Sequence, residues 1–83
     1  MAERKKVVVL GAGSWGTALS HHLARIGHDT TLWGRDAAVL EAIRTEHKNP
    51  KYFPDLSLEP AIKTEGDILR AVQPAEAVII AVP

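Results

Sequence analysis

Three glycines carry the chemistry that this sequence indicates most clearly. Gly11, Gly13 and Gly16 follow the apolar run at residues 7–10 with the spacing G-x-G-x-x-G, and a helical pattern begins directly after them. In a strand-to-helix turn the first glycine permits a tight turn, the second lets a ligand approach the backbone, and the third lets the helix pack closely on the strand. The unpaired N–H groups and the positive dipole end of the helix then favour a phosphate group. The spacing therefore predicts a pyrophosphate bound by backbone geometry, which agrees with the absence of Lys and Arg between residues 7 and 24.

The residues after the second predicted strand bear on which dinucleotide would bind. The dinucleotide fingerprint expects an acidic residue about 20 positions after the glycines, on the ribose hydroxyls. Asp36 has that spacing, but Gly34 and Arg35 come first after Trp33, and Asp36 is better placed to cap the next helix. The Arg35 guanidinium can pair with a ribose 2′-phosphate, so the sequence favours NADP(H) over NAD(H). Two alternatives stay open: glycines that serve only a turn, and Arg35 as a surface cation.

Strands and helices that alternate along the chain must position these residues. Continuously apolar, β-branched strands are typical of a parallel sheet covered on both faces, and the alternation predicts βαβ units. Right-handed crossovers would place helices on both faces of the sheet. The periodicity predicts strands at 7–10, 30–33, 61–63 and 77–82, with helices at 15–26, 37–46 and 68–72.

Capping residues and prolines predict where the helices begin and end. We expect Gly27 in the left-handed conformation that follows the first helix, and Asp36 as the cap of the second. Pro50 is expected to end the second helix. Thr64 and Asp67 have the spacing of a capping box before the third helix.

Several conspicuous side chains are predicted to have ordinary structural roles. Trp15 is expected to pack against the strands, while its backbone N–H and that of Ser14 can still face a pyrophosphate. Trp33 is expected in the core. His21 and His22 are expected at or near the surface, since no further metal-ligating group has a useful spacing. Ser14 has no partner that would make it a nucleophile, and no metal site is predicted.

Composition excludes several classes of protein. The chain has 83 residues, enough for one small domain, and 46% of them are hydrophobic. Ten basic residues balance ten acidic ones, which gives no electrostatic reason to expect nucleic acid or an anionic membrane as partner. No cysteine is present, which fits a reducing cytoplasm. The apolar runs are too short for a signal peptide or for a membrane span of about 18 residues.

Four motifs together resemble a known family. They are Gly-Ala-Gly-Ser-Trp-Gly-Thr-Ala-Leu at 11–19, Leu-Trp-Gly-Arg at 32–35, His-x-Asn-x-x-Tyr-Phe-Pro at 47–54 and Ala-Val-Pro at 81–83. This combination resembles the start of bacterial-type NAD(P)-dependent glycerol-3-phosphate dehydrogenase, over essentially the whole chain. One departure is Phe53, where the family more often has Leu.

The resemblance implies a cofactor site and a reaction. It places eight residues at or near the cofactor: Gly11, Gly13, Ser14, Trp15, Gly16 and Arg35, with Tyr52 and Phe53 in a loop beside it. The family reduces dihydroxyacetone phosphate to sn-glycerol 3-phosphate with NAD(P)H, for phospholipid synthesis. The implied partners are the dinucleotide, a small phosphorylated substrate and, in the parent protein, a second copy.

The resemblance also implies that residues 1–83 are the amino-terminal part of an NAD(P)-binding domain. The expected fold is α/β: a Rossmann-type doubly wound parallel sheet, partial, with strand order 3-2-1-4. The helical substrate domain and the catalytic residues would lie beyond Pro83, so no catalytic residue is assigned and the chain alone is expected to be inactive. The alternatives are another NADP-linked dehydrogenase of the β-hydroxyacid or ketopantoate type, and a non-catalytic nucleotide-binding module.

Overall fold

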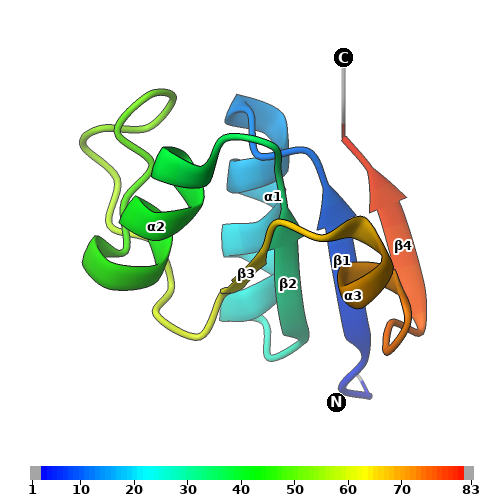
Figure 1. The fold of residues 1–83 in the computed structure, drawn as a ribbon. Helices are drawn as coiled ribbons and strands as arrows, with labels where there is room; N and C mark the ends of the chain where they lie inside the picture. The colour runs from blue at the N-terminus through cyan, green and yellow to red at the C-terminus, as the bar shows by residue number, and fades with distance from the viewer. Residues whose placement is uncertain (1–2, 82–83) are drawn as a thin grey trace.

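The computed structural model describes residues 3–81 and contains one sheet of four parallel strands (Figure 1). Their order across the sheet is β3-β2-β1-β4, which confirms the predicted order. The strands are β1 (Lys6–Leu10), β2 (Asp29–Trp33), β3 (Lys63–Glu65) and β4 (Ala77–Ile80). The helices are α1 (Ser14–Arg25), α2 (Ala37–Glu46) and α3 (Ile68–Val72). No helix within residues 3–81 is long and apolar enough to cross a membrane.

Helices lie on both faces of the sheet, as the crossover rule predicts. Figure 1 shows α1 behind the sheet and α3 in front of it. The main core lies on the α1 side, where Val9 and Leu32 are directly paired across β1 and β2 and are both fully buried. From the helices, α1 adds Ala24 to this core, and α2 adds Val39 and Ile43. The buried apolar residues of α2 therefore hold that helix against the strands, whereas the buried face of α1 is made of small residues.

The third strand begins later than the sequence predicts. Residues 61–63 were expected as the strand, but β3 is Lys63–Glu65. Ile62 is buried in the core cluster just before the strand, so its apolar side chain anchors the chain without being part of the ladder. The polar residues that follow pair with β2 through the backbone, which an edge strand can do without an apolar face.

The expected capping box before α3 is wrong. Thr64 lies within β3 and cannot cap a helix. Asp67 caps α3 instead, because its carboxylate accepts hydrogen bonds from the N–H groups of Leu69 at 2.9 Å and Arg70 at 3.2 Å. The fourth strand was expected to reach residue 82, but β4 ends at Ile80; Ala81 is not part of it, and residue 82 lies outside the described residues.

The ends of the other helices follow local signals more closely. Gly27 has φ of 100° directly after α1, which confirms the left-handed residue predicted there. Asp36 caps α2, as predicted, with its Oδ1 accepting from Ala38 at 3.0 Å. The end of α2 is made by His47, which is left-handed with φ of 58°, so Pro50 is not the terminator.

Candidate functional site

The turn from β1 into α1 begins at Gly11, which holds a conformation that side chains disfavour. Its φ is 123°, outside the range that residues with a Cβ ordinarily adopt. Its N–H donates to the carbonyl of Trp33 at 2.9 Å, which joins the end of β1 to the end of β2. The predicted tight turn at Gly11 is therefore confirmed, and it places the start of α1 at the carboxyl edge of the sheet.

Gly16 allows α1 to lie directly against that turn. A Cβ at this position would overlap the carbonyl oxygen of Gly11 and would lie 3.4 Å from the Cβ of Ala81. A backbone atom cannot move aside as a flexible side chain can. The close helix packing predicted for the third glycine is confirmed, and Gly16 is buried beneath the turn rather than exposed at its surface.

The space above the turn is open at Gly13. A Cβ built on Gly13 would have no atom within 4 Å, which distinguishes it from Gly16. Gly13 is also the cap residue of α1, and it supplies no side-chain hydrogen bond to the first turn, which contains no acidic residue either. The helix therefore presents N–H groups and a positive dipole end without a side-chain acceptor, an arrangement suited to an anion.

These residues line a cleft of about 1020 Å³ at the carboxyl edge of the sheet. Six of the eight predicted site residues lie on its walls: Gly11, Gly13, Ser14, Trp15, Arg35 and Tyr52. The other two, Gly16 and Phe53, do not line it. The remaining wall includes Gly34, Asp36, Lys51 and Ile80, so three separate turns and the end of β4 meet here.

The two tryptophans differ in their environment. Trp15 has 64% of its surface exposed, so the expectation that it packs against the strands is wrong. It lies in the first turn of α1 and lines the cleft. Trp33 was expected in the core, but it is only half-buried and lines the cleft, where its indole N–H donates to the carbonyl of Gly66 at 3.2 Å.

The turn after β2 brings a free cation to the cleft. Arg35 is exposed there and forms no hydrogen bond or ion pair with any residue in the range 3–81. Gly34 explains why this turn lies so close to the glycine turn: a Cβ on Gly34 would approach the Cβ of Ala12 to 2.7 Å. Close packing of these two turns is therefore a physical reason for glycine at position 34.

Asn49 is a functional candidate that sequence reasoning missed. It is fully buried, and its amide donates to Thr17 Oγ1 at 2.8 Å and to the carbonyl of Ala12 at 3.2 Å. Its Oδ1 accepts from the N–H groups of Lys51 and Tyr52, each at 3.2 Å. One side chain thus joins the loop after α2 to the glycine turn. The available signal was an Asn before Pro50, typical of a turn in which the side chain bonds to the backbone two residues on.

A second contact holds the far end of the same loop. His21 Nδ1 accepts from the N–H of Glu59 at 3.0 Å, while His22 is exposed. Both placements agree with the prediction for the two histidines. Within residues 3–81 no group of His, Asp and Glu is arranged to hold a metal ion.

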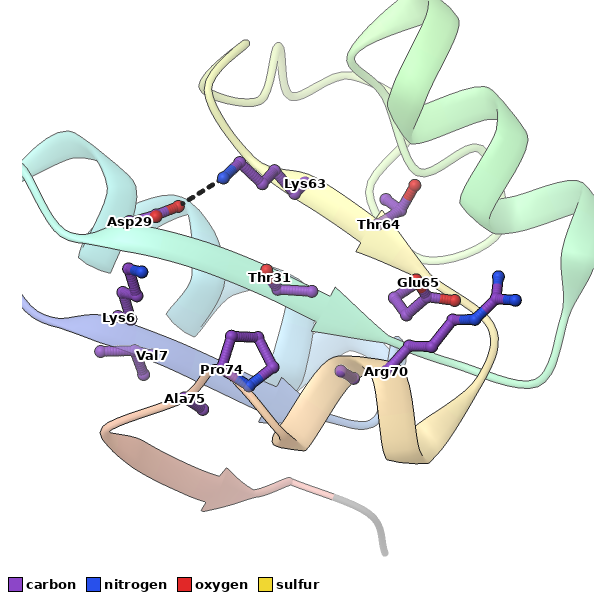
Figure 2. Close-up of a pocket in the computed structure, with 11 residues that line it drawn as sticks. Lys6, Val7, Asp29, Thr31, Lys63, Thr64, Glu65, Arg70, Pro74 and Ala75 are labelled. Atoms are coloured by element: carbon purple, nitrogen blue, oxygen red, sulfur yellow. Dashed lines mark ion pairs between the residues drawn. The ribbon is translucent and has the colours of Figure 1, made fainter.

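A second hollow lies on the face of the sheet that carries α3 (Figure 2). Its volume is about 270 Å³, and its wall mixes cations with acids. Lys63 pairs with Asp29 at 3.1 Å, and Arg70 shares the wall with Glu65. Three cations and two acids line this hollow, but Lys63 is already paired with Asp29 at 3.1 Å and no glycine turn faces it, so it is a weaker candidate than the cleft.

The one pair of shifted groups in the described range lies away from both hollows. The hydrogen bond from Arg44 lowers the pKa of the Glu41 carboxyl, and the same bond raises the pKa of Arg44. Both side chains are exposed on α2 and line neither the cleft nor the hollow under α3. They give no reason to expect acid–base chemistry in the cleft.

The sheet order and the glycine turn define a Rossmann-type α/β domain, with the cleft at the carboxyl ends of the strands. Residues 6–83 match the family model described as NAD-dependent glycerol-3-phosphate dehydrogenase N-terminus. The chain belongs to this family. The resemblance seen in the motifs is thereby confirmed, and the match favours it over the β-hydroxyacid and ketopantoate alternatives.

Individual relatives agree with the family. A glycerol-3-phosphate dehydrogenase (NAD(P)+) of Stenotrophomonas maltophilia is 51% identical over 78 residues, which are 94% of this chain and 23% of that protein. Among solved structures, the Coxiella burnetii glycerol-3-phosphate dehydrogenase is 30% identical with a TM-score of 0.83, covering 93% of this chain and 24% of that one. The Plasmodium falciparum enzyme is 26% identical with a TM-score of 0.85, covering 96% and 25%. The chain therefore spans about a quarter of the length of these relatives.

Proposed function

We propose that this chain binds the adenosine diphosphate half of a nicotinamide dinucleotide in the cleft at the glycine turn. The observation that carries the proposal is the open space at Gly13, directly beside helix N–H groups that have no side-chain acceptor. A pyrophosphate there would accept from the backbone of Ser14 and Trp15. Tyr52, from the loop after α2, also lines the cleft. The predicted contacts of Gly16 and Phe53 with the cofactor stay predictions without support from the shape of the cleft.

NADP(H) is the proposed preference within this cleft, and NAD(H) is the alternative. Relatives of this chain are named for NAD(P)+, which covers both cofactors. The support for NADP(H) is Arg35, an exposed guanidinium without a protein partner in the described range, on the turn that follows β2. A guanidinium forms paired hydrogen bonds with a phosphate, and it has no comparable partner on an unphosphorylated ribose.

For the parent protein we propose the family reaction, reduction of dihydroxyacetone phosphate to sn-glycerol 3-phosphate. The nicotinamide would supply the hydride, and this chain would position it by holding the adenosine half. No catalytic residue is assigned within the chain, which spans about a quarter of the length of its relatives. A second copy as partner, a cytoplasmic location and a role in phospholipid synthesis belong to the same proposal.

Fluorescence offers a direct test of the binding step. Both tryptophans line the cleft, so a bound reduced cofactor should quench their emission and accept energy from it. We expect saturable quenching when the chain is titrated with NADPH, and competition by ADP. Quenching that does not saturate, or that ADP does not reduce, would contradict binding through the diphosphate.

A further inference from the structure

Three charged side chains line the cleft at the end where β2 gives way to α2. They are Arg35, Asp36 and Lys51. Asp36 uses Oδ1 to cap α2, accepting from Ala38 at 3.0 Å and Val39 at 3.3 Å. Its other oxygen, Oδ2, lies 3.9 Å from the ammonium of Lys51. The cap thus holds the carboxylate in place, and Lys51 approaches it from the loop after α2.

The ion pair between Lys51 and Asp36 is weak. The separation of 3.9 Å is longer than a charge-assisted hydrogen bond, and the two side chains are 59% and 48% exposed. Exposed pairs of this kind contribute little to stability. The Lys51 ammonium can therefore exchange Asp36 for a more highly charged anion without a large loss.

Lys51 determines the net charge of this end of the cleft. Arg35 and Asp36 alone would cancel, leaving this end of the cleft without net charge. Lys51 makes the local sum positive by one charge. A phosphate monoester carries roughly 1.5 to 2 negative charges near neutral pH, so two cations match it better than one.

The backbone of Lys51 is held in this position. Its N–H donates to Asn49 Oδ1 at 3.2 Å, and Asn49 is in turn buried against the glycine turn. The ammonium lies 5.6 Å from the centre of the Tyr52 ring, within range of a cation–π interaction. A long side chain on an anchored backbone can reach a ligand without a rearrangement of the loop.

We propose that Lys51 is a second specificity-determining cation for the ribose 2′-phosphate, acting with Arg35 at the same end of the cleft. This inference rests on the proposed function, because it needs the adenosine half in the cleft. The proposal adds a cation from the loop after α2. The sequence motifs did not indicate that this loop binds a phosphate through a charged side chain. Asn49 would then contribute to ligand binding indirectly, because it holds the backbone of Lys51.

Two nucleotides that differ by one group provide the test. Adenosine 2′,5′-bisphosphate carries the 2′-phosphate, and 5′-AMP lacks it. The chain, its Lys51→Met variant and its Lys48→Met variant would be titrated with both by calorimetry. Lys48 is a matched control because it is an exposed cation on the same loop that lines a different hollow, with Glu46 and Pro54. Circular dichroism would confirm that each variant keeps the fold.

We expect Lys51→Met to weaken the bisphosphate about three- to tenfold, the range for losing one charge-assisted contact at a partly exposed site. Binding of 5′-AMP should not change, and Lys48→Met should behave like the original chain. An unchanged preference for the bisphosphate in Lys51→Met would overturn this inference alone. Equal weakening of both nucleotides would also overturn it, because Lys51 would then act on the shared phosphate. Failure of the original chain to bind either nucleotide would overturn the proposed function together with this inference.

Discussion

The side-chain amide of Asn49 donates to Thr17 Oγ1 at 2.8 Å, between positions 32 residues apart in the sequence. Both side chains are fully buried. The bond joins the loop after α2 to the first turns of α1, and Ala12 accepts a further bond from the same amide. A buried polar pair of this kind fixes the position of the loop relative to the helix. If the loop moved, both polar groups would lose their hydrogen bond, and no water is available to replace it.

Removing this pair should destabilise the chain and loosen the loop. Asn49→Ala leaves Thr17 Oγ1 and the N–H groups of Lys51 and Tyr52 without their partner. We expect a loss of about 1–3 kcal/mol in the free energy of unfolding, measured by urea denaturation. Nucleotide binding should weaken as well, because the loop carries Lys51 and Tyr52 into the cleft.

Thr17→Ser and Thr17→Val form the matched control for this prediction. Serine keeps the hydroxyl that accepts from Asn49, whereas valine has nearly the same shape without it. We expect Thr17→Ser to stay close to the original stability and Thr17→Val to lose most of what Asn49→Ala loses. Additive effects in the double variant Asn49→Ala with Thr17→Val would show that the two residues do not act as a pair.

Asn49 also shows where prediction from sequence ends. Its residue type and the following Pro50 indicate a local turn, but the partners Thr17 and Ala12 are set by the tertiary fold. The spacing of the glycines, by contrast, has a local cause: Gly11 needs its positive φ and Gly16 needs contact with Gly11. Local backbone demands could be predicted, and a contact across 32 positions could not.

Alanine should destabilise the chain at Gly16 but not at Gly13. Gly16→Ala places a methyl group on the carbonyl oxygen of Gly11, so α1 must shift away from β1. We expect a loss of about 1–3 kcal/mol in unfolding free energy, as for an overpacked core. Gly13→Ala meets open space and should leave the stability nearly unchanged.

Binding separates the two roles further. Gly13→Val should retain a near-native circular dichroism spectrum and lose binding of ADP, because its side chain would fill the space proposed for the pyrophosphate. Thermal unfolding and ADP titration of the same samples provide both measurements. A Gly13→Val chain that still binds ADP normally would place the diphosphate elsewhere.

Arg35 should determine discrimination between the two cofactors. Arg35→Ala removes a cation that has no protein partner among residues 3–81, so the fold should not change. A charge-assisted contact contributes about 1.5–3 kcal/mol, so we expect NADPH binding to weaken roughly tenfold to 150-fold and NADH binding to stay the same. Titration followed by tryptophan quenching measures both. Equal weakening for NADH and NADPH would rule out a contact with the 2′-phosphate.

The edges of the elements show a second limit on prediction. Asp36 was expected as a cap because an acidic residue precedes a helical pattern, and the structure agrees. Thr64 had an equally good capping pattern, yet it lies in β3, where it pairs with Leu32 of β2. Pairing with a neighbouring strand overrides a capping signal when the residue lies at the sheet edge. The exposure of Trp15 could not be predicted for the same kind of reason. Which residues of α1 the sheet covers is determined by the tertiary fold and not by the local sequence.

Asp36 offers a substitution that separates its two roles, cap and charge. Asp36→Asn keeps an oxygen that can accept from Ala38 and Val39, so α2 should remain capped and the stability should change little. The change removes the negative charge 3.9 Å from Lys51, which leaves two cations in this part of the cleft. We expect tighter binding of NADPH, about two- to fivefold, the scale of one exposed charge interaction. NADH should be affected less, and added salt should reduce the gain because screening weakens exposed charges.

Asp36→Ala is the comparison, because it removes the same charge but also the cap, at a loss of about 0.5–2 kcal/mol in unfolding free energy. If Asp36→Asn weakened NADPH instead, the carboxylate would be contacting the ribose hydroxyls directly, and the assignment of this end of the cleft to a 2′-phosphate would be wrong.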